Sequence, residues 1–177
     1  MNQPYRLIAR PGIDEYLTDE PPYPDLLPAD DLLLQHMEEN FLSTRSLIID
    51  LPEEKLSFRY APGKWTIREM LMHLIDTERI MTYRALRFAR NDSTELPGFD
   101  HLKFVGNSGA DHRSPENMLD EFQAVRFSTI ALFNGLDEEA LLRKGRINKN
   151  SASVRGLAYH IAGHELHHRN LIHKYYI

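Results

Sequence analysis

Apolar residues recur at helical spacing in four stretches of the chain, and this pattern predicts four long helices. The first stretch covers about residues 29–49, and the second begins after Thr66 and runs to about residue 90. The third covers residues 115–134, and the fourth runs from about residue 153 almost to the last residue. No stretch shows a convincing strand alternation, so the pattern predicts an all-α fold.

Local signals mark the ends of two of these helices. Thr66 is followed three residues later by Glu69, which is the spacing of a capping box at a helix N-terminus. Ser114 precedes Pro115, a cap residue followed by the residue that suits the first helical position. The pair Asn134–Gly135 is typical of a helix C-terminus. These signals predict where the second and third helices begin and where the third ends.

The connections predict how the chain is organised. Six of the ten prolines fall in residues 1–28, so we expect an extended N-terminal arm there, followed by a helical bundle over residues 29–177. Residues 91–113 lack a periodic pattern, and at about 3.3 Å per extended residue they could cross the whole bundle. The second and third helices therefore need not be antiparallel neighbours, and a loop of this length is commonly functional.

Composition excludes several classes of protein. The chain has 177 residues and a formal net charge of −5, with acidic and basic residues interleaved, which argues against a nucleic-acid-binding surface. It has no apolar run of membrane-spanning length and no apolar stretch typical of a signal peptide, so we expect a cytoplasmic protein. It also has no cysteine, so a metal must be bound by imidazole and carboxylate, and a reacting thiol must come from another molecule.

The candidate chemistry lies in the last helix, where five of the nine histidines fall between residues 160 and 173. Residues four apart on a helix lie one turn above each other, which lets two imidazoles reach one metal ion. Both His160–His164 and His164–His168 have this spacing. Only His164 and His168 lie in the middle of the apolar stripe, and His160 and His167 lie towards its edge. The inward pair predicts either a metal site or two hydrogen-bonded core histidines.

Residues 164–168 read HELHH, which matches the His-Glu-x-x-His pattern of zinc peptidases. The extended form of that motif requires glycine at position 171 and histidine at 174, where the chain has Leu171 and Lys174. The other form requires a glutamate on a later helix, and only nine residues follow His168. The peptidase interpretation therefore fails, and a third ligand must come from earlier in the chain.

His73, on the second predicted helix, is the best candidate for this third ligand. The apolar stripe of that helix lies about 100° to one side of His73, so the ring would have to face a neighbouring helix from the flank of the stripe. Two carboxylates are candidates for supporting roles. Glu165 is either a general base or a solvated helix carboxylate, and Asp76 could orient the ring of His73.

Three segments resemble the DinB/YfiT-like proteins. The segment YAPGKWTIREMLMHLIDTER (residues 60–79) is similar to the surroundings of that family's second helix, and GHELHHRNLI (163–172) to its C-terminal His-x-x-x-His helix. The segment LPGFD (96–100) looks like the family's loop after the second helix. The resemblance covers the chain from about residue 29 onward. It implies a four-helix bundle in up-down-down-up order.

The resemblance also implies a divalent metal, zinc or nickel in the first place, bound by His73, His164 and His168 with an open coordination position. It implies a homodimer, and either an S-transferase that uses a low-molecular-weight thiol such as bacillithiol or mycothiol, or a metal-dependent hydrolase of a small substrate. The alternative is a metal-bearing bundle that binds a ligand or partner in stress physiology without catalysis. A third possibility is an ordinary dimerising bundle whose histidines are hydrogen-bonded in the core.

Overall fold

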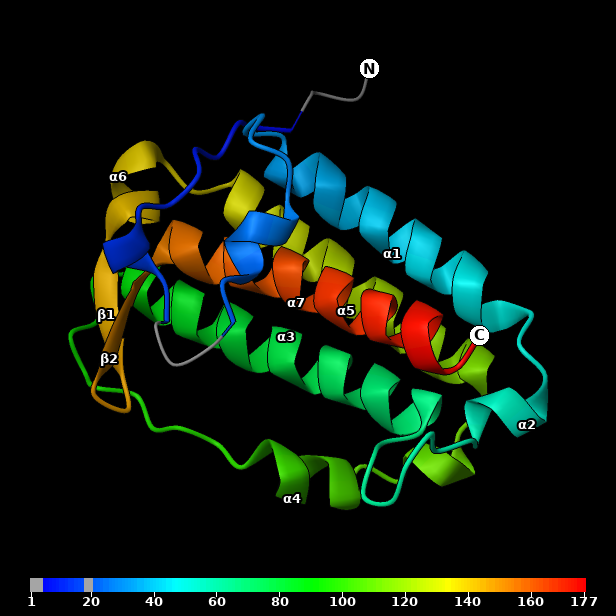
Figure 1. Cartoon of the computed structure of the whole chain (residues 1–177). Helices are drawn as coiled ribbons and strands as arrows, with labels where there is room; N and C mark the ends of the chain where they lie inside the picture. Colours follow the sequence, from blue (N-terminus) through cyan, green and yellow to red (C-terminus); the bar gives the residue numbers. More distant parts are fainter. Residues whose placement is uncertain (1–4, 18–20) are drawn as a thin grey trace.

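The computed structural model describes residues 5–17 and 21–177. Four long helices pack side by side and form a four-helix bundle (Figure 1), as the sequence predicts. These helices are α1 (Leu33–Ile49), α3 (Ile67–Ala89), α5 (Pro115–Asn134) and α7 (Val154–Tyr175). Three short helices lie in the connections: α2 (Glu53–Leu56), α4 (His101–Gly106) and α6 (Glu138–Leu142). None of the helices in the described ranges is both long and apolar enough to cross a membrane.

The direction of the helices follows the up-down-down-up order. In Figure 1, α1 and α7 run one way along the bundle, and α3 and α5 run the opposite way. Helix α3 packs against both α5 and α7, and α1 packs against the same two helices. Residues 91–113 therefore return the chain along the bundle so that α3 and α5 can lie parallel. This connection is not structureless, because it contains α4 and the 3-10 turn η3 (Ala110–His112).

The helix ends confirm the predicted caps and shorten one predicted helix. The side chain of Thr66 accepts a hydrogen bond from the amide of Glu69, and the Glu69 carboxylate accepts one from the amide of Thr66. Ser114 caps α5 in the predicted place. Helix α1 begins at Leu33 and not at about residue 29, because Asp31 has a φ of 59°, in the left-handed region, which a right-handed helix cannot contain.

A β-hairpin precedes α7, so the expectation of a chain without strands is wrong at this point. Strands β1 (Lys144–Ile147) and β2 (Asn150–Ser153) pair antiparallel across a two-residue turn. Both turn residues, Asn148 and Lys149, have positive φ, as a tight hairpin turn requires. The strands have four residues each, too few for alternation to stand out, and packing holds them in place: a Cβ added at Gly145 would lie 2.0 Å from the ring of Phe88.

The described part of the N-terminal arm is folded against α7 and is not simply extended. It contains two 3-10 turns, η1 (Ile13–Glu15) and η2 (Tyr23–Leu26). Tyr159 of α7 donates a hydrogen bond to the carbonyl oxygen of Ile8 over 2.9 Å. Gly163 of α7 lets the arm approach closely, because a Cβ there would lie 2.2 Å from the carbonyl oxygen of Tyr23. The arm thus covers the helix that carries the histidines. Residues 1–4, including Pro4, and 18–20 lie outside the described part.

Candidate metal centre

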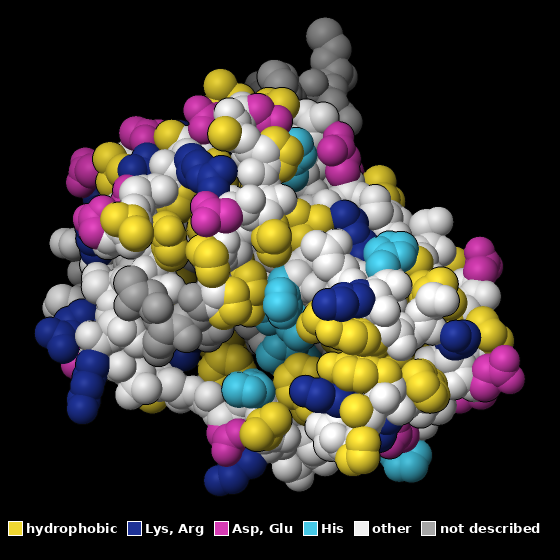
Figure 2. All heavy atoms as spheres, in the orientation of Figure 1, with side chains coloured by type: hydrophobic (Ala, Val, Ile, Leu, Met, Phe, Trp, Pro, Cys, Tyr) yellow, Lys and Arg dark blue, Asp and Glu magenta, His cyan; other side chains and the backbone are white. Residues whose placement is uncertain are grey.

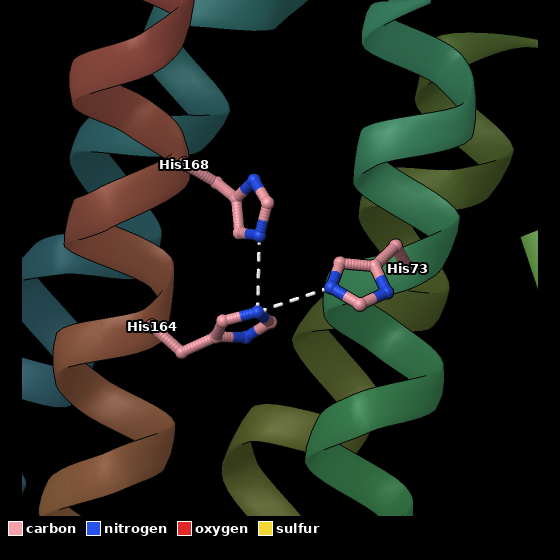
Figure 3. Close-up of side chains that lie close together, drawn as sticks. All are labelled: His73, His164 and His168. Carbon is pink, nitrogen blue, oxygen red and sulfur yellow. Dashed lines mark hydrogen bonds between the residues drawn. The ribbon is translucent and has the colours of Figure 1, made fainter. Parts of the chain in front are cut away.

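Three histidines from two helices converge on one point inside the bundle (Figure 3). His73 projects from α3, and His164 and His168 project from successive turns of α7. The Nε2 atom of His164 lies 3.0 Å from the Nε2 atom of His73 and 3.0 Å from that of His168. One nitrogen from each ring lies within 4.8 Å of the others. The structure therefore brings together the three residues that the sequence selected.

These nitrogen contacts are not explained by hydrogen bonds between the rings. A ring nitrogen carries either one proton or one in-plane lone pair, so Nε2 of His164 can make one well-directed hydrogen bond and not two. Nitrogens bound to zinc at 2.0–2.1 Å in tetrahedral geometry lie roughly 3.3 Å apart. The observed separations are close to this value. The donor set and its geometry fit a divalent cation.

Burial keeps the three rings in the form that binds metals. Desolvation lowers the pKa of His73 to about 4, and it lowers the pKa values of His164 and His168 well below the ordinary value. Neighbouring rings add to the effect, because a charge on His73 would repel a charge on His164 or on His168. At neutral pH all three imidazoles are therefore uncharged, and each has a nitrogen lone pair available.

The second nitrogen of His73 is held by a different residue from the one expected. Nδ1 of His73 lies 3.5 Å from the hydroxyl of Thr77, one turn along α3. Asp76 is half-buried, and desolvation raises the pKa of its carboxyl. Within the described part of the chain no hydrogen bond joins Asp76 to His73. The proposed orienting role of Asp76 is thus not supported, since its side chain leaves α3 at a different angle from that of His73.

Glu165 is neither solvated nor directed at the histidines. Its side chain is 1% exposed, so the expectation of a solvated carboxylate is wrong. Its two oxygens accept hydrogen bonds from Thr44 of α1 and Arg126 of α5, each over 2.7 Å. It does not line the cavity at the histidines, which removes the geometric basis for a general base. One residue along a helix turns a side chain by about 100°, so Glu165 faces α1 and α5 while His164 faces α3.

Arg126 also binds Glu78 of α3, which completes a buried ion triad that sequence reasoning did not predict. Its Nη2 atom donates to a Glu78 oxygen over 2.7 Å, and Nη1 also donates to the backbone carbonyl of Met37 over 2.6 Å. The three charged side chains, Glu78, Arg126 and Glu165, are each 3% exposed or less. A signal was present in the sequence, because Glu78 lies in the apolar stripe of its helix, where a charge requires a partner.

A cavity of about 350 Å³ lies beside the three histidines. Figure 2 shows histidine side chains gathered in a hollow on this face, with hydrophobic side chains next to them. The arm, the hairpin and the 96–101 segment supply its walls, together with α3 and α7. No Asp or Glu is among the described residues that line it. The lining residues include Tyr23, Trp65, Met81, Arg84, Phe99, His101, Asn148 and Asn150.

His160 and His167 also line this cavity. Two more histidines of α7 therefore lie near the cluster, although the sequence places both at the edge of the apolar stripe of this helix. The ring of His160 stacks on that of His164 with centroids 5.7 Å apart, and desolvation lowers the pKa of His160 to about 4. Tyr23 of the arm lies edge-on to His160, with centroids 5.0 Å apart. The arm therefore shields the end of the histidine row from solvent.

Comparisons with known proteins agree with this architecture. The family model of the DinB superfamily matches residues 36–172. The chain belongs to the DinB superfamily. A relative in Oceanobacillus iheyensis, named "Putative metal-dependent hydrolase", is 31% identical over 122 residues, which cover 67% of this chain and 68% of the relative. The solved structure of YfiT from Bacillus subtilis, described as a probable metal-dependent hydrolase with an unusual four-helix bundle topology, matches with a TM-score of 0.70.

The YfiT match covers 97% of this chain and 96% of YfiT at 17% sequence identity, so it supports the fold alone. The DinB model begins within α1 and ends near the end of α7, and it therefore includes all four long helices. The resemblance of residues 60–79, 96–100 and 163–172 to the DinB/YfiT-like proteins is confirmed.

Proposed function

We propose that this DinB protein is a metal-dependent enzyme that binds one divalent ion, zinc or nickel, through His73, His164 and His168. The observation that carries the proposal is the pair of 3.0 Å contacts made by one ring nitrogen, which a shared cation satisfies and hydrogen bonds do not. The names of the relative in Oceanobacillus iheyensis and of YfiT point to the same class of protein.

A divalent ion held by three neutral imidazoles keeps its charge and an open position, so it can polarise a substrate carbonyl or activate a water or a thiol. The chain's own residues supply the rest of the site. Burial keeps the rings neutral, Thr77 limits the rotation of the His73 ring, and the adjoining cavity is large enough for a small substrate. Among the described lining residues no carboxylate competes for the ion or neutralises it.

Two reactions are compatible with this site. Hydrolysis of a small substrate uses water, and S-transfer uses a low-molecular-weight thiol, which must be supplied from outside because the chain has no cysteine. The names of the relatives favour hydrolysis, and the family resemblance also allows S-transfer. A screen of ester and amide hydrolysis and of thiol conjugation, with and without the metal, separates the two. Formation of a homodimer and a cytoplasmic location stay predictions.

The ligand set is tested by metal content. Untagged protein purified without chelator should contain about one divalent ion per chain, and His164→Ala should contain almost none, because two imidazoles bind an ion far more weakly than three. The matched control is His173→Ala, which removes an exposed histidine of the same helix and should leave the metal content unchanged. Elemental analysis is the measurement. Wild-type protein without metal, or His164→Ala with a full complement, would contradict the proposal.

A further inference from the structure

A second cavity, of about 240 Å³, adjoins the candidate metal centre. It shares two lining residues, Trp65 and His168, with the larger cavity. The indole ring of Trp65 lies 6.3 Å from the His168 ring and 4.7 Å from the His73 ring, measured between centroids. A group bound in the second cavity would therefore lie one aromatic ring away from the histidine cluster.

The walls of this second cavity are mainly aromatic and aliphatic. Its lining residues are Tyr60, Gly63, Lys64, Trp65, Met70, Leu102, His168, Leu171 and Tyr176. Met70 and Tyr176 are almost fully buried, and Tyr176 directs its hydroxyl to the backbone carbonyl of Trp65, so its ring forms a fixed wall. Leu102 of α4, by contrast, is 63% exposed.

The size of the second cavity sets the class of ligand. An apolar cavity of about 150 Å³ in another protein holds benzene, so a cavity of about 240 Å³ has room for a substituted aromatic ring. Three of its lining residues, Tyr60, Trp65 and Tyr176, are aromatic, and aromatic rings pack favourably against one another in edge-on or offset arrangements. No Asp or Glu is among the described residues of the lining, and the ammonium of Lys64, which is exposed, lies 5.9 Å from the centroid of the Tyr60 ring.

We propose that this second cavity is a substrate subsite that binds a neutral aromatic group, while the reacting group of the same substrate lies beside the three histidines. The inference rests on the proposed metal-dependent function and extends it to a substrate class. The shared residues Trp65 and His168 carry it, because they line both cavities, so the apolar cavity and the cavity at the histidines lie side by side. The enzyme then selects small aromatic compounds over aliphatic ones of similar reactivity.

Trp65 provides the test, because it is the only tryptophan in the chain. Benzyl alcohol is titrated into zinc-loaded, full-length protein while the fluorescence of Trp65 is recorded. Glycerol, an alcohol without an aromatic ring, is the control. We expect a saturable change with benzyl alcohol and none with glycerol. Leu102→Asp should weaken binding at least fivefold, because it places a carboxylate beside the apolar cavity. Leu7→Asp changes a leucine that is 60% exposed and lines neither cavity, and it should bind as the wild type does.

Phe99→Ala distinguishes the two cavities, because Phe99 lines only the larger one, and this variant should weaken benzyl alcohol binding less than Leu102→Asp does. Circular dichroism confirms that each variant is folded. The inference is overturned if the titration does not saturate, if Leu7→Asp weakens binding as much as Leu102→Asp, or if Phe99→Ala abolishes binding. Binding of zinc and of nickel is measured separately by calorimetry. Binding of either ion without aromatic binding overturns this inference alone, and absence of binding of both ions overturns the proposed function and the subsite with it.

Discussion

Two polar clusters lie inside the bundle, and both join α3 to α7. The histidine cluster consists of three neutral rings whose close nitrogens cannot all be hydrogen-bonded to one another, and it lines a cavity. The ion triad of Glu78, Arg126 and Glu165 is joined by two salt bridges, and each of its members has hydrogen-bonded partners. No member of the triad lines the cavity at the histidines.

The two clusters divide the residues of one short motif between the candidate metal centre and the interior of the bundle. In HELHH, the first and last histidines face the cavity, and the glutamate between them faces the interior of the bundle. A buried polar group whose hydrogen-bond partners are all supplied by the protein contributes to the fold. A set of buried polar groups that lack such partners is a candidate ligand site. The following predictions test this division, beginning with the largest expected effect.

Arg126→Met should lower the free energy of unfolding by about 3–5 kcal/mol, because it leaves two glutamates buried without their shared cation. Denaturant unfolding followed by circular dichroism measures the loss. Arg45→Met is the matched control, since Arg45 forms a single exposed pair with Asp120 and should contribute less than about 1 kcal/mol. A loss of similar size in both variants would show that the triad does not stabilise the fold as described.

Zinc at a hundredfold excess over its dissociation constant should stabilise the protein by up to about 2.7 kcal/mol, the value for an ion that binds the folded chain alone. For a chain of this length, that corresponds to a rise in melting temperature of about 5–11 °C. Thermal unfolding with and without zinc measures the rise, and His164→Ala should abolish it. An equal rise in wild type and variant would place the zinc outside the histidine cluster.

Glu165→Gln should lower the free energy of unfolding by about 1–3 kcal/mol, because an amide group replaces an oxygen that accepts a buried hydrogen bond. Zinc affinity, measured by calorimetry, should stay within about threefold of the wild type if Glu165 serves only the triad. The division between the two clusters is wrong if the folded variant loses its zinc. That result would make Glu165 part of the metal centre, although its side chain faces α1 and α5.

Glu15→Gln probes a part-buried ion pair between the N-terminal arm and α7, outside the triad. Arg155 holds the pKa of Glu15 at about 2, below its value of 4.5 in the unfolded chain. The pair therefore stabilises the fold fully above pH 4.5, and this contribution is lost as the pH falls to about 2. The variant should melt about 1–4 °C lower at pH 7, and the difference should shrink below pH 4.5. A constant difference down to pH 3 would refute this assignment.

Local signals in the sequence predicted the helices well. The capping box at Thr66 and the cap at Ser114 are where the spacing placed them, because such hydrogen bonds involve residues only three apart. The pair His164 and His168 also follows from local spacing. His73 was harder to assign, since it lies on the flank of its apolar stripe. In the structure this flank of α3 faces α7, and the contact between the two helices brings the ring into place.

Longer-range contacts determine the features that the sequence did not predict. The hairpin is too short to show a pattern, and it is held by Phe88, far away in the chain. The arm folds into turns because α7 offers two glycines that let its backbone approach, and proline content alone does not reveal such a surface. The sequence left Glu165 as either a general base or a solvated carboxylate, and only the positions of Thr44 and Arg126 show that it is enclosed.

The amino-acid sequence by itself determined the four helices, their caps and the histidines that can share an ion, because helical periodicity and capping depend on residues within one or two turns. Tertiary structure alone decided which way the polar side chains face and what they meet there. Packing of α3 and α7 against each other, and of α1 and α5 behind them, sends the histidines to the cavity and Glu165 to Arg126. Such partners lie tens of residues apart in the chain, so no local pattern encodes them.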